Sequence, residues 1–200
     1  MDGQQHSGRP VRCFDGDELL RSYHDQEWGR PITDERGLYE RLCLEAFQSG
    51  ISWQVVLRKR DALRAAFENF EPDRVAAFDQ RMTELLLSNL DLIRNRAKIG
   101  AVISNARATL ALRTSTTPLP VLIWSFRQPV SSAPRSRIDV PSTTDASRAL
   151  ATTLKAHGFR FIGPTTVYAL MQAVGLVNDH LAACIVREEV EAEHAAMTSM

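Results

Sequence analysis

The chain has 200 residues, of which 44% are hydrophobic, and its 24 basic and 24 acidic side chains give a formal net charge of zero. This is enough for one globular domain with a substantial core, but no apolar run approaches the roughly 20 residues of a membrane span. The polar N-terminus lacks the apolar stretch of a secretory signal, and three cysteines favour reduced thiols or metal ligands over disulfides. We therefore expect a cytoplasmic protein that does not enter membranes.

Helical periodicity dominates the chain as far as residue 112. Thr33 or Asp34 can cap a helix that runs to Gln48, and Gly50 then ends it. Pro72 suits the first position of a later helix. The helices expected after Gly50 cover, in order, residues 51–66, 72–78, 82–90 and 96–112.

The last part of the chain alternates loop and helix. Residues 114–141 contain five prolines, so they predict a long loop around an apolar patch at 121–126. Residues 142–145 resemble a capping box for a helix through His157, and the residues after Cys184 predict a charged, fraying helix. Since the sequence has no strand-like alternation and no repeat, we expect an all-α fold.

Basic side chains gather in three groups, at 58–64, 94–107 and 127–137, while acidic ones concentrate near the C-terminus. The basic groups could line one face and meet phosphates. Ordinary solvated helix faces explain the same pattern at least as well. Charge therefore leaves nucleic-acid binding open.

Residues 155–166 have the layout of a helix-hairpin-helix, with two glycines in a tight turn between helices. Glycine lets a backbone approach a phosphate, and the free N–H groups of the next helix favour its charge. Gly163 and Thr165 are the candidate DNA contacts of this hairpin. An ordinary turn between two helices is the alternative, since glycine is common in turns.

Two cysteines and two histidines could form a closed tetrahedral zinc site. His180 and Cys184 are four residues apart and so would share one helical face, whereas Cys13 and His24 lie far upstream. A buried Cys or His that binds no metal is the commoner situation. If the site exists, protein ligands saturate it, so the metal is structural and ties the N-terminal segment to the last core helix.

Glu45 interrupts an apolar helix face, where a carboxylate is costly unless it has a partner or a function. Trp53 follows the break at Gly50 and could stack on a planar ligand, and Tyr23 belongs to a neighbouring polar and aromatic run. A salt-bridged glutamate and a core tryptophan are the more common explanation of such spacing.

Together these residues resemble DNA-3-methyladenine glycosylase I, a helix-hairpin-helix glycosylase family. The match is in register from about Arg12 to Cys184, nearly the whole chain. Chance does not readily produce several blocks in the right order. The blocks that carry the resemblance are Tyr23–Gly29, Leu44–Trp53, Ile93–Ile99 and Gly175–His180.

The resemblance implies an all-helical helix-hairpin-helix fold with a small zinc-binding lobe joining both chain ends. We expect a flexible tail at 1–11, one glycosylase domain at 12–186 and a charged tail at 187–200. The implied activity is that of a monofunctional, monomeric base-excision repair enzyme acting on alkylated double-stranded DNA. It flips out 3-methyladenine and hydrolyses the N-glycosidic bond with water, leaving an abasic site.

The resemblance also implies roles for single residues. In the family, the residues at Tyr23 and Glu45 hydrogen-bond the methylated base, the one at Trp53 stacks on it, and Glu45 is the leading catalytic candidate. The step from Gly50 to Ile51 presents an apolar plug to the gap left in the DNA. One structural Zn²⁺ per chain is held at the positions of Cys13, His24, His180 and Cys184.

Two departures from the family pattern concern the first metal ligand. Family members often have Cys-x-Trp there, whereas Phe14 follows Cys13 directly and Asp15 replaces the tryptophan. The interval from Cys13 to His24 is also about two residues shorter than usual. The sequence therefore leaves one aromatic wall of the pocket and the geometry at Cys13 open.

No catalytic aspartate is assigned. Many helix-hairpin-helix glycosylases use one just after the hairpin helix, but that position is Asn178 here and Asp179 is one step away. Two other functions remain: a non-catalytic DNA-damage binder, and a zinc hydrolase, for which the sequence lacks a His-Glu-x-x-His motif. Release of free base from alkylated DNA would separate all three.

Overall fold

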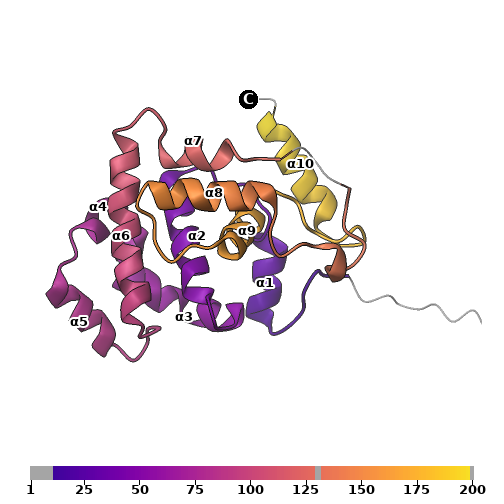
Figure 1. Ribbon diagram of the computed structural model, residues 1–200. Helices are drawn as coiled ribbons and strands as arrows, with labels where there is room; N and C mark the ends of the chain where they lie inside the picture. The colour runs from indigo at the N-terminus through magenta and orange to yellow at the C-terminus, as the bar shows by residue number, and fades with distance from the viewer. Residues whose placement is uncertain (1–10, 129–131, 199–200) are drawn as a thin grey trace, which may run out of the picture.

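The computed structural model describes residues 11–128 and 132–198, and helices are the regular elements of this part of the chain, which contains no strand. Figure 1 shows their arrangement. The expected all-α class is confirmed. The α-helices are α1 (Glu18–Gln26), α2 (Glu35–Gln48), α3 (Trp53–Ala66), α4 (Pro72–Ala76), α5 (Gln80–Ser88), α6 (Arg96–Arg113), α7 (Leu119–Trp124), α8 (Asp145–Ala156), α9 (Pro164–Ala173) and α10 (Arg187–Thr198), with 3₁₀ turns at Glu68–Phe70 and Arg137–Asp139.

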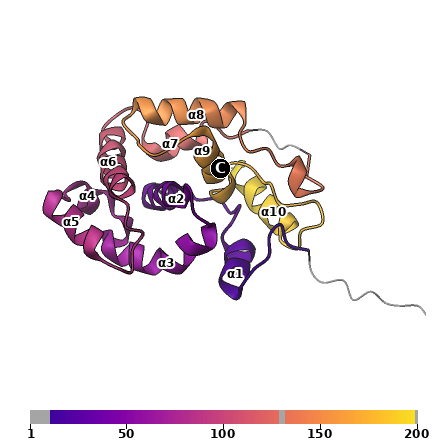
Figure 2. The ribbon, with the colours of Figure 1, turned by 60° about the horizontal axis from the view of Figure 1, so that its bottom comes forward.

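Helix α2 forms the centre of the core. Every residue from Leu38 to Phe47 is buried, and α3, α6, α7 and α9 all pack against it (Figures 1 and 2). A helix enclosed on all sides has no polar face to give to solvent. Its charged residues therefore need partners inside the protein, and this makes Glu45 informative.

One predicted start signal operates as expected: the carboxylate of Asp34 accepts from the Gly37 N–H at 2.8 Å at the start of α2. At the start of α8, the capping box is formed by Thr144 and Ser147, two residues later than the box expected at 142–145. These bonds satisfy N–H groups that a helix leaves free at its first turn. The five helices expected from 33 to 112 are all present, with bounds shifted by a few residues at most.

Two helices were not anticipated. The expected loop at 114–141 contains α7, whose buried side chains Leu119, Leu122 and Ile123 are the apolar patch; its prolines stand at and before the helix start, where proline is tolerated. Helix α1 was missed although the Asp17 carboxylate caps it by accepting from the Leu20 N–H. Positions 129–131 of the expected loop lie outside the described residues.

The N-terminal segment at Val11 lies beside the residues that precede α10, away from α4 and α5 (Figure 2). The Ile185 N–H donates to the Val11 carbonyl at 3.1 Å. Helix α10 does not fray as expected: Val190 is fully buried, and the His194 ring lies 2.7 Å from the Gly29 carbonyl. None of the described helices is both long and apolar enough to cross a membrane.

Candidate functional site

A cavity of about 430 Å³, here called the base cavity, opens between the N-terminal segment, α2, α3 and α9. Four of its walls are aromatic. The Tyr23 and Trp53 rings lie 5.2 Å apart, as do those of Phe14 and Trp28. Such a cavity suits a flat, polarisable ligand. It is lined by Phe14, Leu20, Tyr23, Trp28, Glu45, Gln48, Ser52, Trp53, Gln54, Ala169 and Gln172.

Glu45 brings a carboxylate into this cavity from the last turns of α2. The residue is only 4% exposed, and it accepts no hydrogen bond from the described residues. Burial raises the pKa of Glu45 to about 7, although the positive charge of Arg41 opposes this rise. The Arg41 side chain instead contacts Glu27 at 3.3 Å, and Arg60 holds the same carboxylate at 2.6 and 2.9 Å. Glu45 thus keeps its hydrogen-bonding capacity for a ligand.

Two hydrogen-bond donors of the cavity are also buried. The Trp53 indole N–H is buried and has no hydrogen-bond partner among the described residues. Burial raises the pKa of Tyr23, so its hydroxyl stays protonated at neutral pH and can donate. Since native structures seldom leave buried polar atoms unpaired, the cavity is built for a polar, planar ligand. The structure brings together the three residues expected to bind a base, Tyr23, Glu45 and Trp53.

Phe14 and Gln172 were not anticipated as part of this site. The Phe14 ring lines the cavity despite the shortened segment after Cys13, so it occupies the wall that the sequence left open. Gln172 enters from the last turn of α9. Its position carried no sequence signal, because periodicity identifies a buried helix face but not the cavity that this face meets.

The four predicted metal ligands come together as a second cluster. One donor atom from each of Cys13, His24, His180 and Cys184 lies within 4.8 Å of the others, and all four residues are buried. The Nδ1 atom of His180 is 3.3 and 3.4 Å from the two sulfurs, and Cys184 Sγ is 3.5 Å from His24 Nε2. Ligands bound tetrahedrally to zinc lie about 3.3–3.8 Å apart. These three distances lie in that range, so the cluster could hold a zinc ion.

The outer nitrogens of both histidines are also held. The Asp25 carboxylate lies 2.7 Å from His24 Nδ1, and Arg12 clamps Asp25 from the other side at 2.8–3.0 Å. The Trp28 carbonyl lies 3.0 Å from His180 Nε2. Such partners fix the ring orientation of metal-bound histidine. His180 and Cys184 lie in the irregular segment before α10 and not on a helix, so the expected shared helical face is wrong although the convergence is right.

The metal cluster lies directly behind the base cavity. Cys13 precedes Phe14 and His24 follows Tyr23 in the chain. The Trp28 ring packs edge-on against His180 with centroids 4.6 Å apart. Three aromatic walls are therefore attached to the segments that the cluster ties together.

The hairpin lies between α8 and α9, which pack against each other. Gly158 has a φ of +90° and Phe161 a φ of +60°, a value rare for an aromatic residue. Asn105 of α6 holds this turn through both its amide atoms, at 2.7 and 3.3 Å from the backbone of Arg160. Gly163 caps α9 with open space around it, and Thr165 is exposed.

Lys98 connects the hairpin to the predicted plug. Its buried ammonium group donates to the Phe47 and Ser49 carbonyls at 2.7 and 2.5 Å and lies 5.9 Å from the centre of the Phe161 ring. Gly50 follows with a φ of +80°, and Ile51 is 36% exposed. The plug and the hairpin therefore lie on either side of one lysine, and Gln48 and Ser52, which flank the plug, line the base cavity.

Most of the three basic groups serve the fold. Arg58, Arg60, Arg64 and Arg96 pair with carboxylates, and the remaining bonded members donate to backbone carbonyls: Lys59, Lys98, Arg107, Arg127 and Arg137. Solvated or internal pairing thus accounts for most of this charge.

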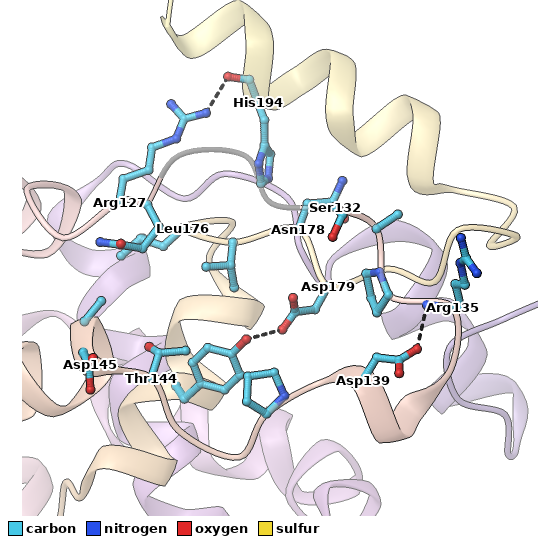
Figure 3. Close-up of a pocket in the computed structure, with 17 residues that line it drawn as sticks. Arg127, Ser132, Arg135, Asp139, Thr144, Asp145, Leu176, Asn178, Asp179 and His194 are labelled. Atoms are coloured by element: carbon cyan, nitrogen blue, oxygen red, sulfur yellow. Dashed lines mark hydrogen bonds between the residues drawn. The ribbon is translucent and has the colours of Figure 1, made fainter.

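A larger cavity of about 890 Å³ is lined by Tyr168 of α9 and by residues of mixed charge from other segments (Figure 3). Asn178 faces this cavity and not the base cavity. The Asp179 carboxylate accepts from Tyr168 and Gln172 at 2.6 and 2.8 Å. Neither Asn178 nor Asp179 lines the base cavity, which agrees with leaving a catalytic aspartate unassigned.

The sequence pattern of the family described as methyladenine glycosylase matches residues 13–188. The chain belongs to this family. The assignment made from the sequence blocks is thereby confirmed, as is the enzyme class, a monofunctional DNA-3-methyladenine glycosylase. The base cavity and the cysteine and histidine cluster both lie inside the matched range.

Individual relatives agree with this membership of the methyladenine glycosylase family. DNA-3-methyladenine glycosylase 1 of Escherichia coli K12 is 45% identical over 170 residues, which cover 84% of this chain and 91% of that protein. A crystal structure of 3-methyladenine DNA glycosylase I is similar with a TM-score of 0.85 and 47% identity, covering 88% of this chain and 98% of that one. A variant of such an enzyme in complex with 3-methyladenine has a TM-score of 0.83 and 29% identity, covering 86% and 94%.

Proposed function

We propose that this protein excises 3-methyladenine from alkylated double-stranded DNA as the first step of base-excision repair. The observation that carries the proposal is the buried Glu45 carboxylate, which accepts no hydrogen bond from the described residues and faces an aromatic cavity. A purine methylated at N3 carries a positive charge. An anionic acceptor and aromatic faces both attract such a cation, whereas normal adenine offers no charge to compensate the buried carboxylate.

The reaction asks little of the protein beyond extrusion and binding. The cationic base is already a good leaving group, so holding it against Glu45, Tyr23 and Trp53 favours cleavage of the N-glycosidic bond. Water then adds to the sugar and leaves an abasic site. Glu45 is the catalytic candidate because it touches the departing base.

DNA would be held at the mouth of the base cavity. Ile51 would fill the gap left by the extruded nucleotide, and Gly50 allows the sharp turn that exposes it. The hairpin would meet a phosphate through the first N–H groups of α9, near Gly163 and Thr165. The contacts of Lys98 with the Ser49 carbonyl and the Phe161 ring would hold the plug and the hairpin in a fixed relative position.

One structural Zn²⁺ per chain fits the Cys13, His24, His180 and Cys184 cluster. Four protein ligands leave no open position, so the ion would hold the chain ends together and take no part in hydrolysis. We propose that the protein acts as a monomer. We place it in the cytoplasm, where its three free cysteines would stay reduced.

The test is to incubate methylated duplex DNA with purified protein and measure free 3-methyladenine by chromatography. Release at a rate proportional to enzyme supports the proposal. Binding to methylated DNA without release would instead show a damage-binding protein. Release that stops when chelator is added, while the fold stays intact, would point to zinc-dependent hydrolysis.

A further inference from the structure

Gln172 is a polar residue of the base cavity that has no role in the proposed reaction. It lies in the last turn of α9 and lines the cavity with Tyr23, Glu45 and Trp53. Unlike Glu45, it has partners inside the protein. These partners decide which atom of its amide is presented to a ligand.

The orientation of the Gln172 amide follows from its contact with Asp179. The two are 2.8 Å apart, and a carboxylate can only accept hydrogen bonds, so the group that faces it must be the amide NH₂. The opposite orientation would place two oxygens against each other. The carbonyl oxygen Oε1 is therefore the free edge of the side chain, and it accepts no hydrogen bond within the described part of the protein.

Tyr168 holds Asp179 in this position. Its hydroxyl donates to the same carboxylate oxygen at 2.6 Å, and burial together with the neighbouring carboxylate raises the pKa of Tyr168, so the hydroxyl remains a donor. Figure 3 shows Asp179 bonded to the tyrosine at the edge of the larger cavity. Tyr168 and Gln172, one helical turn apart on α9, thus hold the same Asp179 oxygen, and Gln172 lines the base cavity with an amide oxygen that accepts no hydrogen bond from the described residues.

We propose that the Gln172 carbonyl reads the exocyclic amino group of the flipped base and so selects adenine-type over oxo-type purines. This inference rests on the proposed glycosylase function. At position 6, an adenine-type base carries an amino group with two hydrogens, and Glu45 and Gln172 together supply an acceptor for each. A hypoxanthine-type or guanine-type base carries an oxygen there, which would leave the Gln172 acceptor facing another acceptor.

Asp179 is then a positioning residue. It does not line the base cavity, but it dictates which end of the Gln172 amide does so. Changing Asp179→Asn removes that constraint, because the new amide can donate to Gln172 Oε1 and let its NH₂ turn toward the ligand. The cavity would then gain a donor that suits an oxo group.

The test compares two free bases that differ at position 6, 3-methyladenine and 3-methylhypoxanthine. Their dissociation constants are measured by quenching of tryptophan fluorescence, since Trp28 and Trp53 line the cavity. The wild-type protein should prefer 3-methyladenine. Gln172→Met, which keeps the length of the side chain, should lower this preference on the order of tenfold, and Asp179→Asn should lower it in the same direction.

Gln80→Met makes the same chemical change at an exposed position of α5 and should leave the preference unchanged. Equal affinity of the wild type for both bases would overturn the inference, whatever the variants do. So would an unchanged ratio in folded Gln172→Met or Asp179→Asn, or a loss of affinity that is equal for both bases. If wild-type protein releases no 3-methyladenine from DNA, the proposed function fails; if it does and the ratio is insensitive, only this inference fails.

Discussion

Burying the Glu45 carboxylate lowers the stability of the protein. An unfolded glutamate has a pKa near 4.5, whereas burial raises the pKa of Glu45 to about 7. Below about pH 4.5 both states are protonated and there is no cost. As the pH rises, the unfolded state ionises first, so the destabilisation grows up to about pH 7 and is then constant. A protein retains such a cost where a function requires the group.

Replacing this carboxylate should therefore stabilise the protein in a pH-dependent way. We expect the unfolding free energy of Glu45→Gln, relative to that of the wild type, to increase by about 2–4 kcal/mol from pH 4.5 to pH 8. This follows from a pKa difference of about 2.5 units at 1.36 kcal/mol each. Urea unfolding at the two pH values measures this. Glu71→Gln changes an exposed glutamate and should show almost no such gain. A gain that is equal at both pH values would rule out the buried, ionisable state.

The same titration should appear in catalysis. The lesion is a fixed cation, so it binds best to ionised Glu45, and kcat/KM reports the free enzyme. We expect kcat/KM for 3-methyladenine release to fall about tenfold per pH unit below about pH 7, and the residual activity of Glu45→Gln to lose that dependence. Initial rates across pH 5–8.5 test this. An identical profile for both proteins would assign the titration to another group.

Among the elements, the helices predicted best are those with a clear cap at the start, such as α2 and α8. Prolines made α7 resemble a loop, because proline occurs both in loops and at helix starts. The spacing of His180 and Cys184 suggested a helix, yet the same four-residue step in an irregular segment brings the side chains together. Local pattern could not show that contacts with Cys13 and His24 accompany this conformation.

The buried ammonium group of Lys98 links α6 to the end of α2. Lys98→Met would leave the Phe47 and Ser49 carbonyls without this donor, so we expect a loss of about 1–3 kcal/mol in unfolding free energy. Lys59→Met is the matched control, since Lys59 also donates to two carbonyls but in an exposed setting, and should lose less than about 1 kcal/mol. Equal losses in urea unfolding would show that the buried hydrogen bonds of Lys98 stabilise the fold no more than the exposed ones of Lys59.

The hairpin offers no amine to the sugar. Pro164, Thr165 and Thr166 follow Gly163, and Lys155 is exposed on α8; the base cavity has no lysine among its walls. An amine nucleophile is needed for a Schiff base with the sugar. Borohydride added during turnover should therefore trap no protein–DNA adduct, and strands should break only after alkali. An adduct that disappears in Lys155→Ala would contradict hydrolysis by water.

At the scale of the whole molecule, the chain closes on itself through the cysteine and histidine cluster. The sequence predicted the four residues, but a buried Cys or His that binds no metal remained an alternative. Cys13 and His180 are 167 residues apart, and this separation says nothing about their proximity. The structure adds that the cluster lies behind Phe14, Tyr23 and Trp28. The aromatic walls and the closure of the chain thus depend on the same contacts.

Purified protein should contain about one zinc per chain, and removing it should lower the melting temperature. Cys184→Ser should lose the metal and lower the melting temperature. The affinity of the remaining folded protein for the base should change little. Cys43→Ser is the control: this cysteine is equally buried but lies outside the cluster, so it should keep the metal. Metal-free protein with unchanged melting would disprove the structural role.

The most direct measurement of the central claim compares two affinities in Glu45→Gln. Affinity for 3-methyladenine is measured by calorimetry, and affinity for undamaged duplex DNA is measured at one fixed salt concentration. Because Glu45 faces the base cavity and not the outer surface, base affinity should fall at least about tenfold while DNA affinity stays nearly the same. Equal loss of both affinities would show that Glu45 supports the fold and does not recognise the base.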